Sequence, residues 1–540
     1  MNSTTLAAAS SVSEPHITRP RFDSKPSATT VGLFITLLVG GIAYTAISLS
    51  SDVAETGSQT TAYISFFLLG LALLIALGFE FVNGFHDTAN AVATVIYTHS
   101  LPPNVAVVWS GTFNFIGVLI SSGAVAFGII SLLPVELILQ VGSGAGFAMV
   151  FALLIAAIIW NLGTWWLGLP ASSSHTMVGS ILGVGVANAL MHGRDGTSGV
   201  DWAQATKVGY TLLLSPLFGF ILSALLLLLM KAFVKEKALY EEPKTNAPPP
   251  VWIRGLLILT CTGVSFFHGS NDGQKGMGLI MLILVGTVPL SYALNRAMPE
   301  SQVTRFAAVA QVTQQSLRES RPGAAIPADP RKVLSDYLRT KTYTDEVVPA
   351  LTAITGDIGN QVKQRTSLKQ VPAAAVANVR NDMYLTSEAV KVLQKSGKVE
   401  FSADAAKNLT AFRKEIDNAT KFIPLWVKVA VAIALGLGTM VGWKRIVMTV
   451  GEKIGKTHLT YAQGAAAEIV AMATIGAADG LGLPVSTTHV LSSGVAGTMA
   501  ANRSGLQWGT LRNLLMAWVL TLPVAIVLSG SLYWLFTHIF

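Results

Sequence analysis

The stretch GLPASSSH at residues 168–175 returns later in the chain as GLPVSTTH at residues 482–489. Each copy joins two apolar segments, so we expect each to form the tip of a helical hairpin, one over 147–191 and the other over 463–501. Chance is a poor explanation for a proline, a hydroxyl triplet and a histidine at matching positions. The two copies therefore indicate an internal duplication.

The composition of the 540 residues is that of a polytopic membrane protein. Apolar residues make up 51% and charged residues 12%, about half of what a water-soluble domain carries. Cys261 is the single cysteine, which excludes an internal disulfide framework and a thiolate metal cluster. Most of the apolar runs can cross a bilayer. They lie at 31–49, 62–82, 105–130, 147–168, 207–232, 252–268, 277–294, 423–442, 463–483 and 512–537.

Clusters of Lys and Arg predict which short connections face the cytoplasm. We place inside the four basic segments, which are 19–25, 231–254, 444–456 and 503–512. We place outside the three connections with at most one basic residue, which are 50–61, 131–146 and 191–206. The N-terminus is then expected inside and the C-terminus outside.

This sidedness requires two polar interruptions at membrane depth. If 252–294 crossed the bilayer twice, the basic cluster that follows residue 442 would fall on the outer side. We therefore expect one crossing there, with its helix broken at 267–273. By the same logic 62–98 forms one crossing, broken around 83–87.

The chain then falls into two repeats of opposite orientation, each with a broken crossing, a crossing, a hairpin and a crossing. The predicted fold is an all-α polytopic membrane protein with inverted-topology repeats, broken helices and two re-entrant-type hairpins. Its expected divisions are a polar cytoplasmic N-terminus at 1–30, an extra anchor and outer connection at 31–61, the first repeat at 62–232, the start of the second at 233–295, an inserted, mostly helical periplasmic domain at 296–421 and the rest of the second repeat at 422–540.

Inverted repeats with discontinuous helices are typical of secondary transporters, whose substrate sites lie near the membrane midplane. The glycines alone have a simpler interpretation, because small residues let membrane helices pack closely. The duplicated hairpin tips favour the transporter.

The hydroxyl triplets are candidates for an anion site. Hydroxyls and unpaired backbone N–H groups at a helix start attract anions, and the helix dipole favours them. Ordinary N-capping by Ser and Thr is the alternative for either tip alone. The duplication favours ligation by all six residues, which are Ser172, Ser173, Ser174, Ser486, Thr487 and Thr488.

Ionisable residues inside membrane segments are expensive and usually line a pathway or pair with one another. Asp87 and Asp272 lie in the two expected breaks, where a carboxylate suits a proton or coupling cation. Lys275 follows Asp272 by one helical turn, so the two side chains are expected to meet. Asn90 takes the equivalent place in the first repeat. An Asp272 to Lys275 ion pair without a substrate role is the alternative.

The chain resembles the inorganic phosphate transporter (Pit) family, in particular its bacterial low-affinity branch. The resemblance covers nearly all of 62–540 and is carried by four motifs. They are NGFHDTANA at 83–91, PASSSH at 170–175, HGSNDGQKG at 268–276 and PVSTTH at 484–489.

This resemblance implies a multi-pass protein of the bacterial cytoplasmic (inner) membrane that imports orthophosphate and is not an enzyme. Phosphate would enter by symport with protons, as a complex with a divalent metal whose site the sequence does not assign. No cofactor and no nucleic acid are expected, and the lipid bilayer surrounds the protein. Assembly into a homo-oligomer is an open alternative. The implied phosphate ligands are the six hydroxyl residues with Asp87, Asn90, Asp272 and Lys275, and the implied proton or cation residues are Glu80, His86, Asp87, Asn271, Asp272 and Glu468.

The sodium-coupled branch of the family has Asn-Asp-x-x-Asn in both motifs. Here His86 replaces the first Asn of one motif, and Lys275 replaces the last Asn of the other. A fixed ammonium could stand in for sodium, and a histidine titrates near neutral pH, so both substitutions favour protons. Glu468 matches a residue of sodium-coupled relatives and keeps sodium coupling as an alternative.

Other functions are open alternatives. Sulfate is also a tetrahedral dianion, but an acceptor carboxylate suits hydrogen phosphate and repels sulfate. An intramembrane hydrolase would need one activated serine, and a duplicated pair has no obvious purpose there. A receptor that senses ligands through 296–421 would bind without flux.

Overall fold

The computed structural model describes residues 20, 22, 27–56, 63–87, 89–133, 137–138, 144–243, 248–363 and 365–539, without the side chains at 63–65, 89–90 and 197–198. Within these ranges the chain is helical and forms no β-strand. Eight of the described helices are long and apolar enough to cross a membrane, or nine if one bent pair counts as a span. The prediction of an all-α polytopic membrane protein is confirmed.

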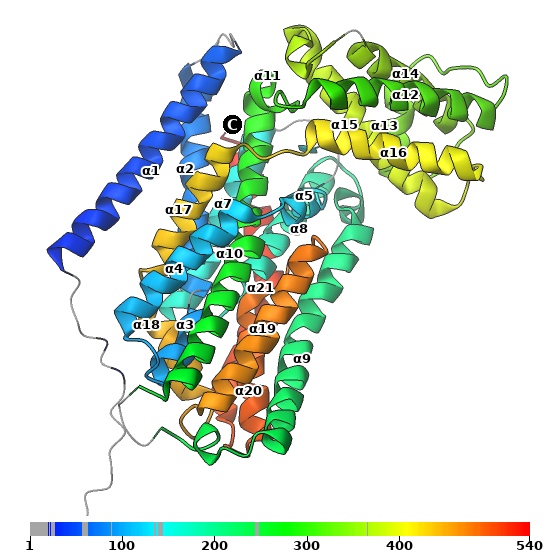
Figure 1. Cartoon of the computed structure of the whole chain (residues 1–540). Coiled ribbons are helices and arrows are strands. Elements are labelled where there is room, and N and C mark those ends of the chain that lie inside the picture. Colours follow the sequence, from blue (N-terminus) through cyan, green and yellow to red (C-terminus); the bar gives the residue numbers. More distant parts are fainter. Residues whose placement is uncertain are drawn as a thin grey trace, which may run out of the picture.

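The membrane helices lie side by side in one bundle, with α1 along its edge (Figure 1). On this edge Gly41 of α1 faces Ile433 of α17, and Phe34 meets Phe81 of α2. The bounds are α1 Ala28–Glu55, α2 Tyr63–Asp87, α3 Ala89–Tyr97, α4 Pro103–Ile120, α5 Ala124–Ile130, α7 Gly144–Trp166, α8 Ser173–Met191, α9 Trp202–Phe233, α10 Val251–Thr287, α11 Pro289–Tyr292, α17 Leu425–Thr439, α18 Lys444–Met448, α19 Tyr461–Gly480, α20 Thr487–Ala501 and α21 Trp508–Phe536.

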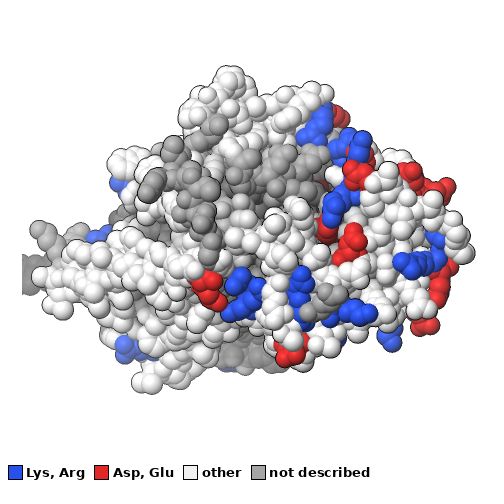
Figure 2. All heavy atoms as spheres, turned by 90° about the horizontal axis from the view of Figure 1, so that it is seen from above, with Lys and Arg blue, Asp and Glu red and all other residues white. Residues whose placement is uncertain are grey.

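The inserted segment packs at one end of the bundle (Figure 1). Its helices are α12 Glu300–Ser320, α13 Pro330–Thr340, α14 Val347–Lys363, α15 Ala373–Ser396 and α16 Ala403–Thr420. They share a hydrophobic core that includes Phe306, Leu351 and Phe412. The chain returns to the bundle through a 69° bend between α16 and α17. Figure 2 shows that charged side chains gather over the insertion, whereas the bundle side of this face is nearly free of them where it is described.

The break predicted around 83–87 is not confirmed, because residues 83–87 belong to helix α2. Helix α2 ends at Asp87 and α3 begins at Ala89, while Thr88 between them lies outside the described residues. The expected crossing at 105–130 is divided, because the backbone turns at Gly123, with a φ of 85°, between α4 and α5.

The second motif segment is not broken, and the predicted interruption at 267–273 is wrong. Helix α10 runs from Val251 to Thr287 without a gap. Its glycines serve close packing instead of unwinding. A Cβ on Gly269 would lie 2.2 Å from the backbone oxygen of Asn114 in α4, a distance no side chain tolerates.

Two hairpins, α7 with α8 and α19 with α20, enter the bundle from opposite ends. At the first tip, Thr449, just beyond α18, donates a 2.7 Å hydrogen bond to the Gly168 carbonyl. At the second tip, the Gly482 carbonyl lies against Gly128 of α5. Because α5 and α18 lie toward opposite ends in Figure 1, the tips point in opposite directions.

The last helix of each half packs against the hairpin of the other half. Helix α21 crosses α8 where a Cβ on Gly183 would meet the Ile526 oxygen at 2.1 Å. Helix α9 crosses α20 where a Cβ on Gly497 would meet the Phe220 oxygen at 2.1 Å. These matched crossings hold the starts of α8 and α20 together in the middle of the bundle.

Candidate functional site

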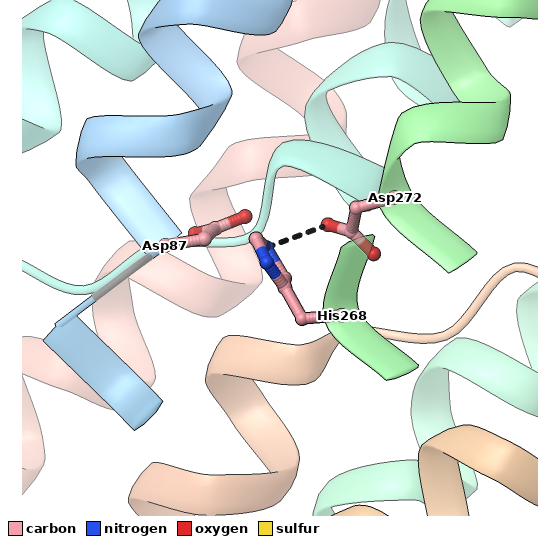
Figure 3. A group of neighbouring side chains, drawn as sticks. All are labelled: Asp87, His268 and Asp272. Carbon is pink, nitrogen blue, oxygen red and sulfur yellow. Dashed lines mark ion pairs between the residues drawn. The ribbon is translucent and has the colours of Figure 1, made fainter. Parts of the chain in front are cut away.

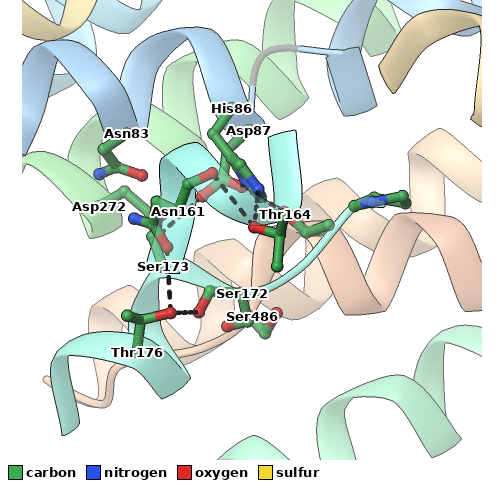
Figure 4. Close-up of polar contacts among 12 residues, drawn as sticks. Asn83, His86, Asp87, Asn161, Thr164, Ser172, Ser173, Thr176, Asp272 and Ser486 are labelled. Carbon is green, nitrogen blue, oxygen red and sulfur yellow. Dashed lines mark hydrogen bonds and ion pairs between the residues drawn. The ribbon is translucent and has the colours of Figure 1, made fainter. Parts of the chain in front are cut away.

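Asp87 is the point at which the two hairpins meet (Figure 4). It ends α2 and is buried, with 2% of its surface exposed. Its carboxylate accepts hydrogen bonds from Ser173 Oγ of the first hairpin at 2.7 Å and from Thr488 Oγ1 of the second at 2.6 Å. His86 Nδ1 lies 2.9 Å from the same carboxylate, and its Nε2 lies 3.1 Å from Thr164 Oγ1. The adjacent residues His86 and Asp87 thus contact side chains from both hairpins.

Asp272 and Lys275 form the other side of this cluster, at an unbroken turn of α10. Their ion pair measures 2.7 Å between Oδ2 and Nζ, and both side chains are fully buried. Lys275 also donates to Ser174 Oγ, and Ser173 Oγ lies 3.4 Å from Asp272 Oδ2. Asp272 Oδ1 accepts no hydrogen bond from the described residues. One carboxylate oxygen therefore stays available for a further donor.

The first hydroxyl of each triplet caps its helix. Ser172 Oγ accepts from the backbone N–H of His175, and Ser486 Oγ accepts from that of His489, both at 3.1 Å. These bonds fill one of the free N–H positions at the start of α8 and of α20. For these two hydroxyls the structure therefore shows the alternative interpretation, ordinary N-capping.

Ser174 of the first tip and Asn271 of α10 both hold the loop of the second tip. Ser174 Oγ donates to the Val485 carbonyl of the other hairpin at 2.7 Å. Asn271 of α10 holds the same loop, because its Nδ2 donates to Leu483 O at 3.0 Å and its Oδ1 accepts from Val485 N at 3.3 Å. Thr487 Oγ1 is buried and has no hydrogen-bond partner among the described residues.

Two histidines stack where the hairpins cross. The ring centroids of His175 and His489 lie 4.6 Å apart, and His489 stacks on Trp518 of α21 at 4.2 Å. Trp518 Nε1 in turn donates to the Pro170 carbonyl at 2.9 Å. The stack joins both tips to α21 through rigid rings.

The two predicted coupling glutamates lie in different places. Glu80 of α2 is buried and accepts a long hydrogen bond of 3.4 Å from Asn83, one turn before Asp87. Glu468 of α19 accepts hydrogen bonds from Thr94 of α3 and Thr260 of α10. Glu468 therefore has hydrogen-bond partners of its own, which are two threonines and not the aspartates.

Asp87, His268 and Asp272 form a group that could hold a metal ion (Figure 3). One ligand atom from each lies within 4.8 Å of the others, and all three side chains are buried. His268 Nδ1 bonds to Asn114 Oδ1 at 2.9 Å, which leaves Nε2 facing Asp272. Two carboxylates and an imidazole suit a divalent cation. The Lys275 ammonium already pairs with Asp272 and competes for it.

Sequence reasoning overlooked several polar residues around the cluster. Asn114 supports His268, Thr164 contacts His86, and Thr176 Oγ1 donates to Asn161 Oδ1 at 3.0 Å. A polar side chain inside an apolar crossing was the available signal. The side chain of Asn90, which was predicted to bind phosphate, lies outside the described residues.

The model of the phosphate transporter family matches residues 83–529. The chain belongs to this phosphate transporter family. It is 42% identical over 487 residues to the low-affinity inorganic phosphate transporter PitA of Escherichia coli K12 and 40% identical over 493 residues to PitB of the same strain. Each alignment covers 87% of this chain and 96% of the relative. This member of the family is therefore a multi-pass transporter and not an enzyme.

A solved structure titled as the sodium-dependent phosphate transporter is also similar. It has 20% sequence identity and a TM-score of 0.49, with 88% of this chain and 100% of that chain covered.

Proposed function

We propose that the protein imports inorganic phosphate through the inner membrane and binds it between the two hairpin tips. The observation that carries the proposal is the double hydrogen bonding of Asp87, which joins Ser173 and Thr488 across the hairpins. Two helix N-termini and a buried ammonium beside them suit an anion. Relatives of about 40% identity are named low-affinity inorganic phosphate transporters, which supports this substrate.

Each group has a role in this proposal. When phosphate binds, the hydroxyls of Ser173 and Thr488 would turn from Asp87, and that of Ser174 from the Val485 carbonyl, to donate to phosphate oxygens. Lys275 neutralises part of the charge. Asp87 and Asp272 accept the P–OH proton of hydrogen phosphate, which sulfate lacks. The capping serines keep the N–H groups of each tip in place, and Thr487 and Asn90 complete the predicted ligand set.

We propose transport by alternating access between two inverted repeats. The matched crossings of α8 with α21 and of α20 with α9 support such a symmetry. Rocking of one half against the other would open the midplane site to each side in turn. The N-terminus and basic loops face the cytoplasm, while the insertion at 296–421 and the C-terminus face the periplasm. Assembly into a homo-oligomer stays open.

Protons drive uptake in this scheme. His86 lies beside Asp87, and Lys275 occupies the position of an asparagine in sodium-coupled relatives, so a fixed positive charge replaces the bound cation. Glu80 of α2 and Glu468 of α19 are buried carboxyl groups and complete the proposed coupling set. Phosphate would travel as a complex with a divalent metal, which Asp87, His268 and Asp272 are placed to contact.

Proteoliposomes test substrate and coupling together. An inward proton gradient should drive entry of labelled phosphate without sodium, and unlabelled arsenate should compete better than sulfate. Strict dependence on sodium would contradict the proton coupling, whereas equal competition by sulfate would contradict the role of the acceptor carboxylates. Counterflow in the absence of any gradient checks that the protein is reconstituted.

A further inference from the structure

A separate cavity lies where the insertion meets the bundle. Its volume is about 60 Å³, several times the roughly 10 to 15 Å³ that one water requires. A small polyatomic ion therefore fits. Helices α5 and α10 supply an apolar wall, and the insertion supplies charged and polar groups. The lining residues are Phe127, Ile130, Ser131, Met281, Leu282, Val285, Arg380, Tyr384, Glu388, Thr420 and Lys421.

Arg380 is the one charged residue of this lining without an ionic partner among the described residues. Its guanidinium lies over the Tyr384 ring at 5.3 Å, and its Nη1 donates to Asn381 Oδ1 at 3.3 Å. The other two charges are already paired. Glu388 bonds to Lys391 at 3.0 Å, and Lys421 bonds to Asp417 at 2.9 Å.

An unpaired guanidinium in a poorly hydrated place needs an anion. Burial lowers the pKa of Arg380, which reflects the lost hydration of its charge. The group stays protonated, because an arginine titrates far above neutral pH. Its planar donors match the oxygens of a phosphate group in pairs.

We propose that this cavity is a second anion site, which binds a phosphate group on Arg380. It is distinct from the site between the hairpins, since none of its lining residues belongs to that cluster. The phosphate group can come from free orthophosphate or from the headgroup of a phospholipid. This proposal depends on the proposed function only because orthophosphate is chosen as the probe.

Equilibrium dialysis of labelled orthophosphate against the full chain in maltoside detergent, which carries no phosphate, counts the free-phosphate sites. Arg380→Gln is expected to bind one phosphate fewer per chain than wild type, and Arg380→Lys to keep the site. Arg413→Gln, which removes an arginine charge of the insertion on α16, away from the cavity lining, serves as the matched control. Equal melting temperatures show that each variant is folded.

Native mass spectrometry of the chain from membranes with phosphatidylglycerol is the second arm. Loss of one retained lipid in Arg380→Gln, with unchanged orthophosphate binding, identifies a lipid headgroup as the occupant. If Arg380→Gln matches wild type in both arms, the proposal is overturned. The double variant of Ser173→Ala with Asp272→Asn separates the two sites, because it should lose the hairpin phosphate and keep the Arg380 one.

Discussion

The two aspartate motifs occupy equivalent places in the sequence but differ in structure. Hydroxyls from two distant hairpins hold the Asp87 carboxylate. Asp272 lies within a continuous helix, and a lysine one turn away holds its carboxylate. One aspartate therefore depends on tertiary contacts, while the other is satisfied largely by its own helix.

In the proposed transport cycle the two copies of the motif would have different tasks. The Asp87 carboxylate bridges the two hairpins, so its hydrogen bonds would change when the hairpins separate. The Asp272 carboxylate is paired within one helix, so Asp272 and Lys275 would hold the substrate with a fixed arrangement of charge. The substitutions below test this contrast.

The largest expected effect follows Asp87→Asn. The asparagine amide keeps one acceptor oxygen but no charge, and a hydrogen bond to a charged acceptor contributes about 1.5 to 3 kcal/mol. Loss of one bond and weakening of the other therefore predict an uptake rate lower by about 10² to 10³. Asp272→Asn is also expected to abolish uptake, through loss of the charge that orients Lys275. Initial rates of labelled phosphate entry into proteoliposomes at matched protein levels measure both. Asp201→Asn, a change between two good N-caps at the start of α9, should transport normally. Uptake at the wild-type rate in Asp87→Asn would remove the basis of the proposed site.

Lys275→Gln tests the buried ion pair between Asp272 and Lys275. It leaves Asp272 buried without its cation, which is expected to lower the stability by about 3 to 5 kcal/mol. Adding Asp272→Asn should restore most of the lost melting temperature but no transport. Lys421→Gln breaks an exposed pair of the insertion and should change the stability by at most about 1 kcal/mol. Additive losses in the double variant would show that the ion pair has no energetic role.

Gly276→Ala tests the close packing of the unbroken helix. The new Cβ would lie 2.3 Å from Glu80 Cγ, so the buried Glu80 side chain or α2 itself must shift, which is expected to destabilise the protein by about 1 to 3 kcal/mol. Gly255→Ala on the same helix meets nothing within 4 Å and should be neutral or slightly stabilising. Thermal melting in detergent compares the pair, and equal melting temperatures would argue against tight α2 to α10 contact.

The smallest effects are expected at the caps. Ser172→Ala and Ser486→Ala each remove one bond to a helix N-terminus and should lower the stability by about 1 kcal/mol, to the same extent at both tips. Thr487→Ala, which removes no hydrogen bond made by the described residues, should melt closer to wild type. A much larger loss at one cap than at the other would show that the hairpins are not equivalent.

Much of this site could be predicted from residue types and their order. The duplicated triplets predicted two helix starts near each other, and the spacing of Asp272 and Lys275 predicted their ion pair. The division of labour within a triplet could not be predicted. Ser172 caps locally, but the partners of Ser173 and Ser174 come from α2, α10 and the other hairpin.

The break in α10 was predicted wrongly for a related reason. Glycines and polar residues at 267–273 indicate an unwound segment when their neighbours are unknown. In the structure Ser270 and Gln274 bond to Asp479 of α19, and Gly269 lies against α4. Polar groups that find partners on adjacent helices do not require the backbone to open.

The order of residues is enough to show that this chain is a helical membrane protein, that its hydroxyl-rich tips are duplicated and that charged groups accompany them in the membrane. Those properties follow from hydrophobicity, helical spacing and the energetic penalty of charge in lipid, which are local. The folded structure was needed to show that Asp87 joins both hairpins, that α10 is continuous and that Arg380 lines a cavity between the insertion and the bundle. Each of these depends on which helices pack together, because a buried polar group is stabilised by whatever partner packing brings within hydrogen-bond distance.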